Sequence, residues 1–317
     1  MLASDSSVRP PSAVAPSPVS PGIQRVFMAN LVAQVGIVVT GGLVRVTGSG
    51  LGCPTWPECV GGSLVPVAGQ AQEWHKYVEF GNRLLTFVLG ALAIAAVVAA
   101  LRLRAQWLAE GSVPRRSVLV LTTVPLAGTF AQALLGGVTV LTGLHPLLVG
   151  AHFMLSMAVI AGCVALVRRA GEPGDEPLVR LVRPEIRVLS LVLIANCATV
   201  IVLGTLVTGA GPHSGDADVS HRLPIDLRTV AWLHADAVLL FIGLIVGMWL
   251  ALRLTDGPDR AQTWAHVLMG LAVVQGALGY TQWFTEVPWA LVATHMLMAC
   301  LIWVATLQTH LSLRSRG

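Results

Sequence analysis

Eight apolar stretches of about 20 residues alternate with short polar segments along the 317-residue chain. Each stretch is long enough to cross a hydrocarbon core about 30 Å thick. Inside lipid such a stretch must be helical, because only a helix satisfies its own backbone hydrogen bonds there. The spans are predicted at residues 24–44, 78–101, 117–140, 146–168, 186–209, 229–253, 262–283 and 288–310. The pattern therefore predicts an all-α integral membrane protein with eight transmembrane helices.

The composition excludes a soluble protein. Hydrophobic residues make up 55% of the chain and charged residues only 11%, whereas a water-facing surface needs roughly a quarter charged residues. Among the basic residues Lys76 is the single lysine, and no run of basic residues is long enough to follow a phosphate backbone. We therefore expect a lipid bilayer, and no nucleic acid, around this chain.

The basic residues also predict the orientation. With the N-terminal tail placed in the cytoplasm, 15 of the 20 basic residues fall on the cytoplasmic side. The remaining five are Arg45, Lys76, Arg83, Arg222 and Arg228. Because cytoplasmic loops are enriched in arginine and lysine, we expect both termini in the cytoplasm of a multi-pass protein. The loop that contains Cys53 and Cys59 then faces the oxidising, outer side of the membrane.

An internal repeat divides the chain. The segment Gln132–Gly136 reads QALLG, and Gln275–Gly279 reads QGALG. The offset of 143 residues between the two glutamines recurs between His152 and His295. Two similar four-helix halves in the same sense are predicted. The expected units are a disordered cytoplasmic tail at 1–22, an N-terminal half at 23–168, a cytoplasmic linker at 169–185 and a C-terminal half at 186–311.

Three of the nine histidines lie well inside predicted spans. His152, His234 and His295 each follow the start of a span by about 5–7 residues, about 8–10 Å below the outer surface at 1.5 Å per residue. A single intramembrane histidine is more often a core residue than a ligand. Three imidazoles at one depth, on helices that run the same way, form a layout that suits haem iron held between facing helices.

The two halves differ at one repeat-related position. Asn82 stands where the repeat places the counterpart of His234. Because asparagine is a poor ligand for haem iron, the first half offers only His152 from this pair. The second half is thus predicted to hold a permanent haem between two histidines, and the first half to leave an open or exchangeable iron position for a substrate.

Charged residues surround the mouth of the first half. Glu79 lies three residues before Asn82, on the same helical face. It is either an ordinary acid at a helix N-terminus or a proton acceptor beside a bound substrate. Four arginines on the outer side are candidates for contacts with haem propionates, although snorkelling to the interface explains them equally well. These are Arg45, Arg83, Arg222 and Arg228.

Residues 41–59 read GGLVRVTGSGLGCPTWPEC and resemble the first outer loop of bacterial heme A synthases. The resemblance extends over nearly all of residues 25–310. It includes Glu79 before the ligand position of the second helix, and the histidines 152, 234 and 295. It implies a plasma-membrane enzyme that oxidises the C8 methyl group of haem O to a formyl group, which gives haem A for terminal oxidases.

The same resemblance implies roles for individual residues. A resident haem b binds between His234 and His295 and relays electrons, substrate haem O binds at His152, and Glu79 takes part in catalysis. The cysteine pair Cys53 and Cys59 is implied to form a disulfide. An exposed disulfide would be labile, so a redox-active and a structural bond both remain open.

Two features depart from the family pattern. The usual Glu-x-x-His of the second helix ends here in Asn82, and the outer loop at 209–228 has no second cysteine pair. Four-histidine ligation therefore does not carry over. The electron acceptor in the membrane, docking to the farnesyltransferase that makes haem O, and self-association into a homo-oligomer are left open.

Two other functional classes compete with this interpretation. A b-type cytochrome that oxidises quinol would share the site at His234 and His295, but it gives no reason for a half with one histidine beside Glu79. A transporter built from repeats would need helices interrupted at the midplane, whereas the glycines and prolines here lie mostly at the ends of the spans.

Overall fold

The computed structural model describes residues 16–213, 215–216 and 221–316. Within these residues the chain is almost entirely helical, with one short two-stranded pairing. The helices are α1 Pro21–Val46, α2 His75–Ala109, α3 Arg116–Leu121, α4 Thr123–Leu141, α5 Pro146–Ala170, α6 Pro184–Ala210, α7 Leu227–Leu254, α8 Asp259–Phe284 and α9 Trp289–Leu311. The strands β1 Val179–Arg180 and β2 Arg314–Ser315 pair antiparallel.

Within the described residues, seven stretches are long and apolar enough to cross a membrane, with α3 and α4 counted as one. The prediction of an integral membrane protein built from helices is confirmed at this level. Helix α8 has 26 residues and packs against α7 and α9. It is not among the seven, and it contains the polar residues Gln262, His266, Gln275 and Gln282.

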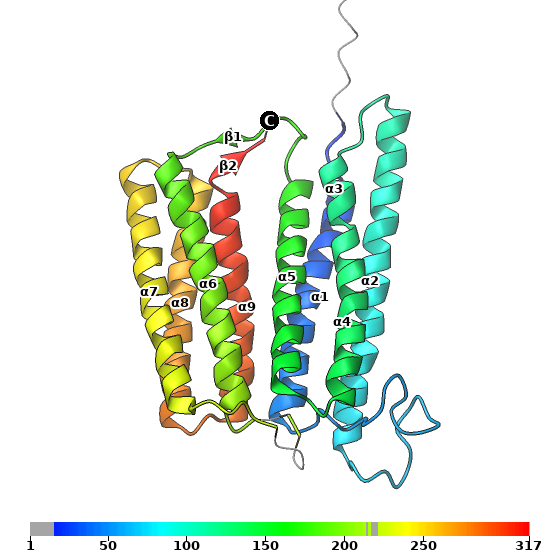
Figure 1. The fold of residues 1–317 in the computed structure, drawn as a ribbon. Helices are drawn as coiled ribbons and strands as arrows, with labels where there is room; N and C mark the ends of the chain where they lie inside the picture. Colours follow the sequence, from blue (N-terminus) through cyan, green and yellow to red (C-terminus); the bar gives the residue numbers. More distant parts are fainter. Residues whose placement is uncertain (1–15, 214, 217–220, 317) are drawn as a thin grey trace, which may run out of the picture.

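The helices form two groups that lie side by side (Figure 1). In one group α1 and α4 each pack against both α2 and α5, so α2 and α5 occupy opposite corners. In the other group α6 and α8 each pack against both α7 and α9, so α7 and α9 occupy opposite corners. Helices α1, α5, α6 and α9 make the contacts between the groups.

The interface between the groups is closely packed. The indole of Trp303 on α9 is buried and donates a hydrogen bond of 2.9 Å to the backbone carbonyl of Met157 on α5. Gly42 on α1 gives room to Met296 on α9, because an added Cβ would lie 2.7 Å from the methionine sulfur. Small residues let membrane helices approach closely, and this contact fixes the two groups against each other.

The third predicted span is broken near its start. Proline lacks a backbone N–H, and its ring clashes with the carbonyl four residues earlier. For Pro125 that carbonyl belongs to Leu121, the last residue of α3. The hydroxyls of Thr122 and Thr123 donate to the carbonyls of Leu119 and Val120 at 2.6 and 2.8 Å. One predicted helix is therefore two, α3 and α4.

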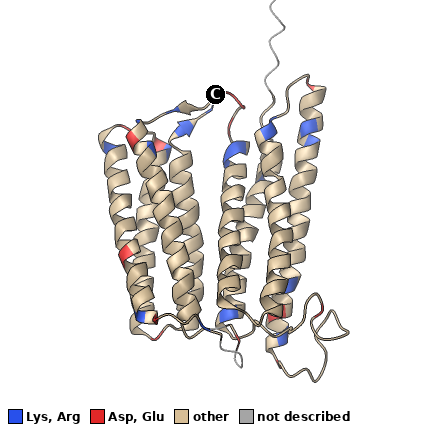
Figure 2. Cartoon of the chain, in the orientation of Figure 1, with Lys and Arg blue, Asp and Glu red and all other residues tan. Residues whose placement is uncertain are grey.

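The start of α1, the C-terminal strand β2 and most of the described basic residues gather at one end of the bundle, which we call the linker end because it also holds the α5–α6 linker (Figures 1 and 2). The opposite end, which holds the Cys53 loop, is called the disulfide end. Between the two ends the helices carry very few charges (Figure 2). This distribution matches the charge pattern of a membrane-spanning bundle.

The tail boundary predicted at residue 22 lies close to the start of α1 at Pro21. Residues 1–15 lie outside the described residues. Ser20 caps α1, and its hydroxyl accepts from the N–H of Ile23. Upstream, the carbonyl of Ser17 accepts a 2.8 Å hydrogen bond from the indole of Trp107 on α2, and Val19 is buried. Capping and side-chain packing thus order the chain before its apolar span begins.

Candidate functional site

His234 lies on α7 and faces α6. Its Nδ1–H donates a 3.0 Å hydrogen bond to the backbone carbonyl of Val200 on α6. An added Cβ on Gly204 would lie 3.3 Å from Cε1 of the ring, so this glycine gives the imidazole its space. A carbonyl on one ring nitrogen fixes the tautomer and leaves the lone pair on Nε2. His234 is thus prepared to act as an Nε2 ligand.

His295 lies on α9 and faces α8. The side-chain amide of Gln275 on α8 donates a 3.1 Å hydrogen bond to the backbone carbonyl of His295. The ring lies over Gly279, whose added Cβ would be 3.5 Å from Cε1. Since α7 and α9 occupy opposite corners of the same group, the two histidines approach its core from opposite sides.

His152 lies on α5 in an arrangement that repeats the one at His295. Gln132 on α4 donates a 3.1 Å hydrogen bond to the carbonyl of His152, and Gly136 gives room to the ring, with an added Cβ 3.3 Å from Cε1. Gln132 has a further partner, because it also donates to the hydroxyl of Ser156 at 2.6 Å. The 143-residue repeat therefore preserves a glutamine, a glycine and a histidine in matching contacts.

These histidines fit a haem group. The Nδ1 atoms of His152 and His295 are buried and have no hydrogen-bond partner among the described residues. Such atoms are uncommon in native proteins, and here both lie at the same place in the repeat. No three His, Cys, Asp or Glu side chains in the described part of the chain gather as a conventional metal site. A haem iron needs only one or two axial nitrogens, which single histidines on facing helices can supply.

Asn82 takes a different partner from its counterpart. It lies on α2, where the hydroxyl of Thr40 on α1 donates a 2.8 Å hydrogen bond to Oδ1. This hydrogen bond joins α1 to α2, just as the hydrogen bond between His234 and Val200 joins α7 to α6. The structure thus places Asn82 at the corner opposite His152, but with an amide in place of an imidazole.

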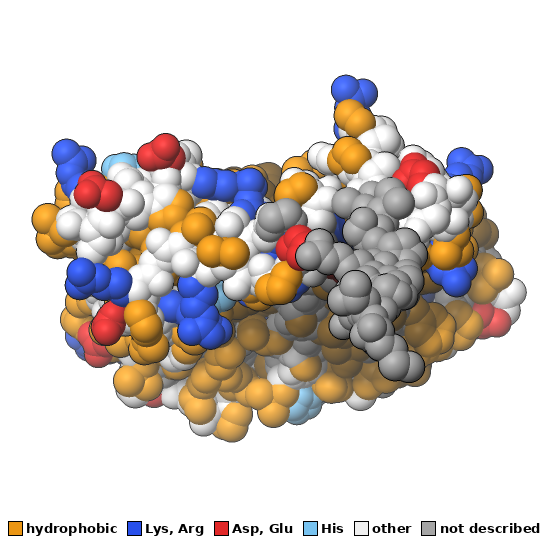
Figure 3. Space-filling model, turned by 90° about the horizontal axis from the view of Figure 1, so that it is seen from above, with side chains coloured by type: hydrophobic (Ala, Val, Ile, Leu, Met, Phe, Trp, Pro, Cys, Tyr) orange, Lys and Arg blue, Asp and Glu red, His pale blue; other side chains and the backbone are white. Residues whose placement is uncertain are grey.

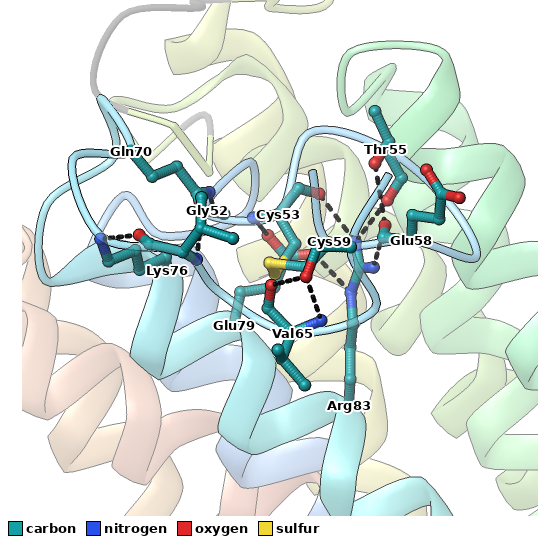
Figure 4. Close-up of a disulfide and its surroundings, with 12 residues drawn as sticks. Gly52, Cys53, Thr55, Glu58, Cys59, Val65, Gln70, Lys76, Glu79 and Arg83 are labelled. Carbon is teal, nitrogen blue, oxygen red and sulfur yellow. Dashed lines mark hydrogen bonds and ion pairs between the residues drawn. A yellow bond between two sulfur atoms is a disulfide. The ribbon is translucent and has the colours of Figure 1, made fainter. Parts of the chain in front are cut away.

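Glu79 is buried, and each of its carboxylate oxygens has a hydrogen-bond partner (Figure 4). One carboxylate oxygen accepts a 2.6 Å hydrogen bond from the backbone N–H of Cys53. The other accepts from Arg83, at 3.0 Å from Nε and 2.6 Å from Nη2. The two residues are one helical turn apart on α2. Glu79 is therefore not a solvated acid at a helix start, and its carboxylate joins α2 to the cysteine loop.

Cys53 and Cys59 form a disulfide, as the resemblance implies. Both cysteines have 0% exposure, so the expectation of an exposed bond is wrong. The loop folds back over the sulfurs because Arg83 holds it by three backbone carbonyls, at 2.7 Å to Cys53, 3.0 Å to Thr55 and 3.0 Å to Glu58 (Figure 4).

The loop also rests on the first group of helices. The ring of Trp56 lies against Gly137 on α4, where an added Cβ would be 2.5 Å from Cδ2. Gly136 and Gly137 are thus neighbours with separate functions, since one gives room to the ring of His152 and the other to Trp56. The disulfide loop is positioned directly beside the site at His152.

The four candidate arginines differ in their surroundings. Arg83 is committed to the loop and Glu79. Arg45 on α1 donates to the carbonyls of His213 at 3.0 Å and Thr208 at 3.2 Å, so it satisfies the end of α6. Arg222 and Arg228 are exposed. Of the four, these last two have guanidinium groups at the surface of the disulfide end.

Sequence reasoning missed the supporting residues around the rings. Gly204, Val200 and Thr40 carry no chemical signature in the sequence, because they act through an absent side chain, a backbone carbonyl and a common hydroxyl. The pair Gly136 and Gly279 could have been found, since the same 143-residue offset relates them as relates the histidines.

The fold and site together define a helical membrane protein with two related histidine sites in matching surroundings. The family model COX15-CtaA, described as cytochrome oxidase assembly protein, matches residues 24–307. The chain belongs to this family.

Three relatives that match most of the chain are each named heme A synthase. A heme A synthase of Methylobacterium nodulans is 27% identical over 89% of this chain and 90% of its own length. A heme A synthase of Alkalihalophilus pseudofirmus is 25% identical over 89% and 95%, respectively, and one of Symbiobacterium thermophilum is 27% identical over 83% and 88%. The similarity therefore covers both groups of helices.

Proposed function

We propose that this protein is a heme A synthase, which oxidises the C8 methyl group of haem O to the formyl group of haem A. The observation that carries the proposal is the similarity to heme A synthases over about nine-tenths of both chains. The repeated contacts around His152 and His295 support it, because each half then has the means to orient one haem.

The two haems are assigned by the number of histidines in each half. His234 and His295 hold the resident haem b, which supplies one-electron redox chemistry when bound. Haem O binds in the first half at His152, opposite Asn82. A site with one histidine holds its ligand less permanently than a site with two, which suits a substrate that enters and leaves.

The reaction requires a proton acceptor, and we assign this role to Glu79. Conversion of a methyl group to an aldehyde consumes one water and releases four protons and four electrons to an acceptor in the membrane. A carboxylate oxygen accepts up to two hydrogen bonds, so the Oε2 atom that binds the N–H of Cys53 keeps one free lone pair. Glu79 accepts a proton there, while Arg83 holds the carboxylate in place.

The topology follows the charge distribution. Helix α8 completes eight membrane crossings, with residues 23–168 and 186–311 as the two halves and 169–185 as the linker between them. The linker end with both termini faces the cytoplasm of a bacterial cell, and the disulfide end faces outward, where a disulfide can form. A haem O-making farnesyltransferase is the class of enzyme that supplies the substrate.

A b-type cytochrome that leaves haem unmodified is not favoured. It would need the site at His234 and His295, but it has no use for a first half that carries a single histidine, a buried carboxylate and a disulfide loop. Three relatives that match more than four-fifths of the chain are heme A synthases.

Haem extraction and chromatography test the proposal. The protein is expressed with a haem O-making enzyme, purified, and its haems are separated. We expect haem B together with haem O and haem A. A matched culture without the haem O-making enzyme is expected to give haem B alone. Haem B without haem A in both cultures would support the cytochrome, and a folded protein free of haem would refute both functions.

A further inference from the structure

A hollow opens at the linker end, between the start of α6, the end of α9 and the two short strands. The strand pairing brings the C-terminal segment onto the linker, and the N–H of Leu181 also donates to the carbonyl of Leu313 at 3.1 Å. The hollow is lined by Leu178, Arg180, Val182, Arg187, His310, Leu313 and Arg314. Three separate elements thus contribute one arginine each.

The three arginines share one property: in the described part of the chain their guanidinium groups have no counter-charge, with Arg180 and Arg187 exposed and Arg314 half-buried. Among the described residues no ion pair or side-chain hydrogen bond is formed by the guanidinium groups of Arg180, Arg187 and Arg314, and no carboxylate lines the hollow. The contrast with the neighbouring cluster is clear, because there Arg169 pairs with both Glu172 and Asp175. Seen from this end, blue side chains gather over the group that contains α6 to α9 (Figure 3).

Membrane topology alone does not require this arrangement. The positive-inside bias depends on how many basic residues flank the spans. It does not require those residues to lie close to one another. Here β2 carries Arg314 to Arg187 on α6. Burial, followed by the charges of Arg316 and Arg187, lowers the pKa of Arg314. Like charges brought together without a counter-charge leave a place for an anion.

We propose that this hollow binds a phosphate group, from the headgroup of an anionic phospholipid or from free phosphate. Arginine forks suit phosphate oxygens. His310 is committed elsewhere through Nδ1, which lies 2.8 Å from the hydroxyl of Ser190, so the arginines supply the charge. Leu178, Val182 and Leu313 add an apolar wall beside them, which suits the glycerol portion of a lipid better than a free ion. Basic pockets at the ends of membrane helices bind such headgroups in general.

Thermal unfolding of the full-length protein in neutral detergent tests the site. The probes are phosphatidylglycerol, phosphatidylcholine and inorganic phosphate, each titrated separately. The variant R180Q/R187Q/R314Q is compared with R102Q/R104Q/R116Q, which removes the same charge from exposed arginines at the same end but outside the hollow. Each basic residue near an anionic headgroup contributes about a fivefold gain in affinity.

We expect phosphatidylglycerol to raise the unfolding temperature of the wild type and of the control variant at similar concentrations. The hollow variant should need about a hundredfold more lipid. A matching response to inorganic phosphate would assign the site to free phosphate. Equal losses in both triple variants, or no loss in the hollow variant, would overturn the proposal. If the hollow variant does not fold, R187Q alone should still show about a fivefold loss.

Discussion

The two halves of the molecule share a scaffold and differ in the chemistry placed on it. In both, a glutamine on one helix (α4 or α8) donates a 3.1 Å hydrogen bond to the backbone carbonyl of a histidine on the next helix (α5 or α9). A glycine one turn after the glutamine gives the histidine ring its space. The helices that carry the paired ligand positions occupy opposite corners in both. The contacts that orient one imidazole are therefore the same in the two halves.

The two halves differ at the second ligand position, on α2 and α7, and in the loop that packs beside the first half. Asn82 accepts from the Thr40 hydroxyl, whereas His234 donates to the Val200 carbonyl. Trp56 of the disulfide loop covers Gly137, while the repeat places Tyr280 at that position in the second half, where it is exposed. In the proposed function, this one residue and this one loop distinguish the substrate site from the site of the resident haem.

The largest effect is expected from the second half. Replacing His234 or His295 by alanine should remove nearly all resident haem b, because each variant leaves one axial nitrogen in place of two. The haem content per protein, measured by the pyridine haemochrome spectrum, reports this. His266→Ala is the matched control, since this exposed histidine pairs with Trp249 on α7 and should leave the haem in place. Full haem b in the double variant would refute the ligand assignment.

The next effect separates chemistry from binding in the first half. Glu79→Gln should lower haem A formation by about a hundredfold or more, as expected for loss of a proton acceptor, and keep haem b bound. Arg83→Gln distinguishes a structural role, because it frees the loop and leaves the carboxylate. If both variants lose the same activity, Glu79 only anchors the loop. Glu58→Gln, in the same loop, is the control.

A smaller effect tests whether one residue accounts for the asymmetry. Asn82→His restores an imidazole at the corner opposite His152. We expect the substrate haem to be held more tightly and to adopt the spectrum of a haem with two axial nitrogens, with slower turnover. An unchanged spectrum in the loaded protein would show that position 82 does not face the iron, and the halves would then differ for another reason.

The smallest effect concerns the shared scaffold. Gln275→Leu removes one hydrogen bond to the carbonyl of His295, which should weaken haem b retention by about 1 kcal/mol, or about fivefold. Gln132→Leu should leave haem b unchanged and affect only the first half. The haem b dissociation rate of the two variants compares them directly. Equal loss of haem b in both would mean that the halves are not independent.

The sequence predicted the helices well, but it did not predict the contacts that hold the candidate site in place. Hydropathy located each helix within a few residues at most ends, although α2 continues to Ala109, past the predicted limit at 101, because a helix does not stop where the lipid does. The repeat offset located the histidines. The engagement of Glu79 with the N–H of Cys53 was not predictable, since it depends on how a loop folds back onto α2. The burial of the disulfide has the same origin.

The way in which Arg83 fastens the loop has a practical consequence. The contacts of Arg83 with the loop end at the carbonyl of Glu58. Arg83 does not hold the turn that follows, and Gly61, Gly62 and Leu64 in that turn are exposed. Exposed loop tips of this kind accept insertions readily. A short epitope or a single reactive label placed between Gly61 and Gly62 would project from the disulfide end, and antibody or reagent access in intact cells would show directly which side of the membrane that end occupies.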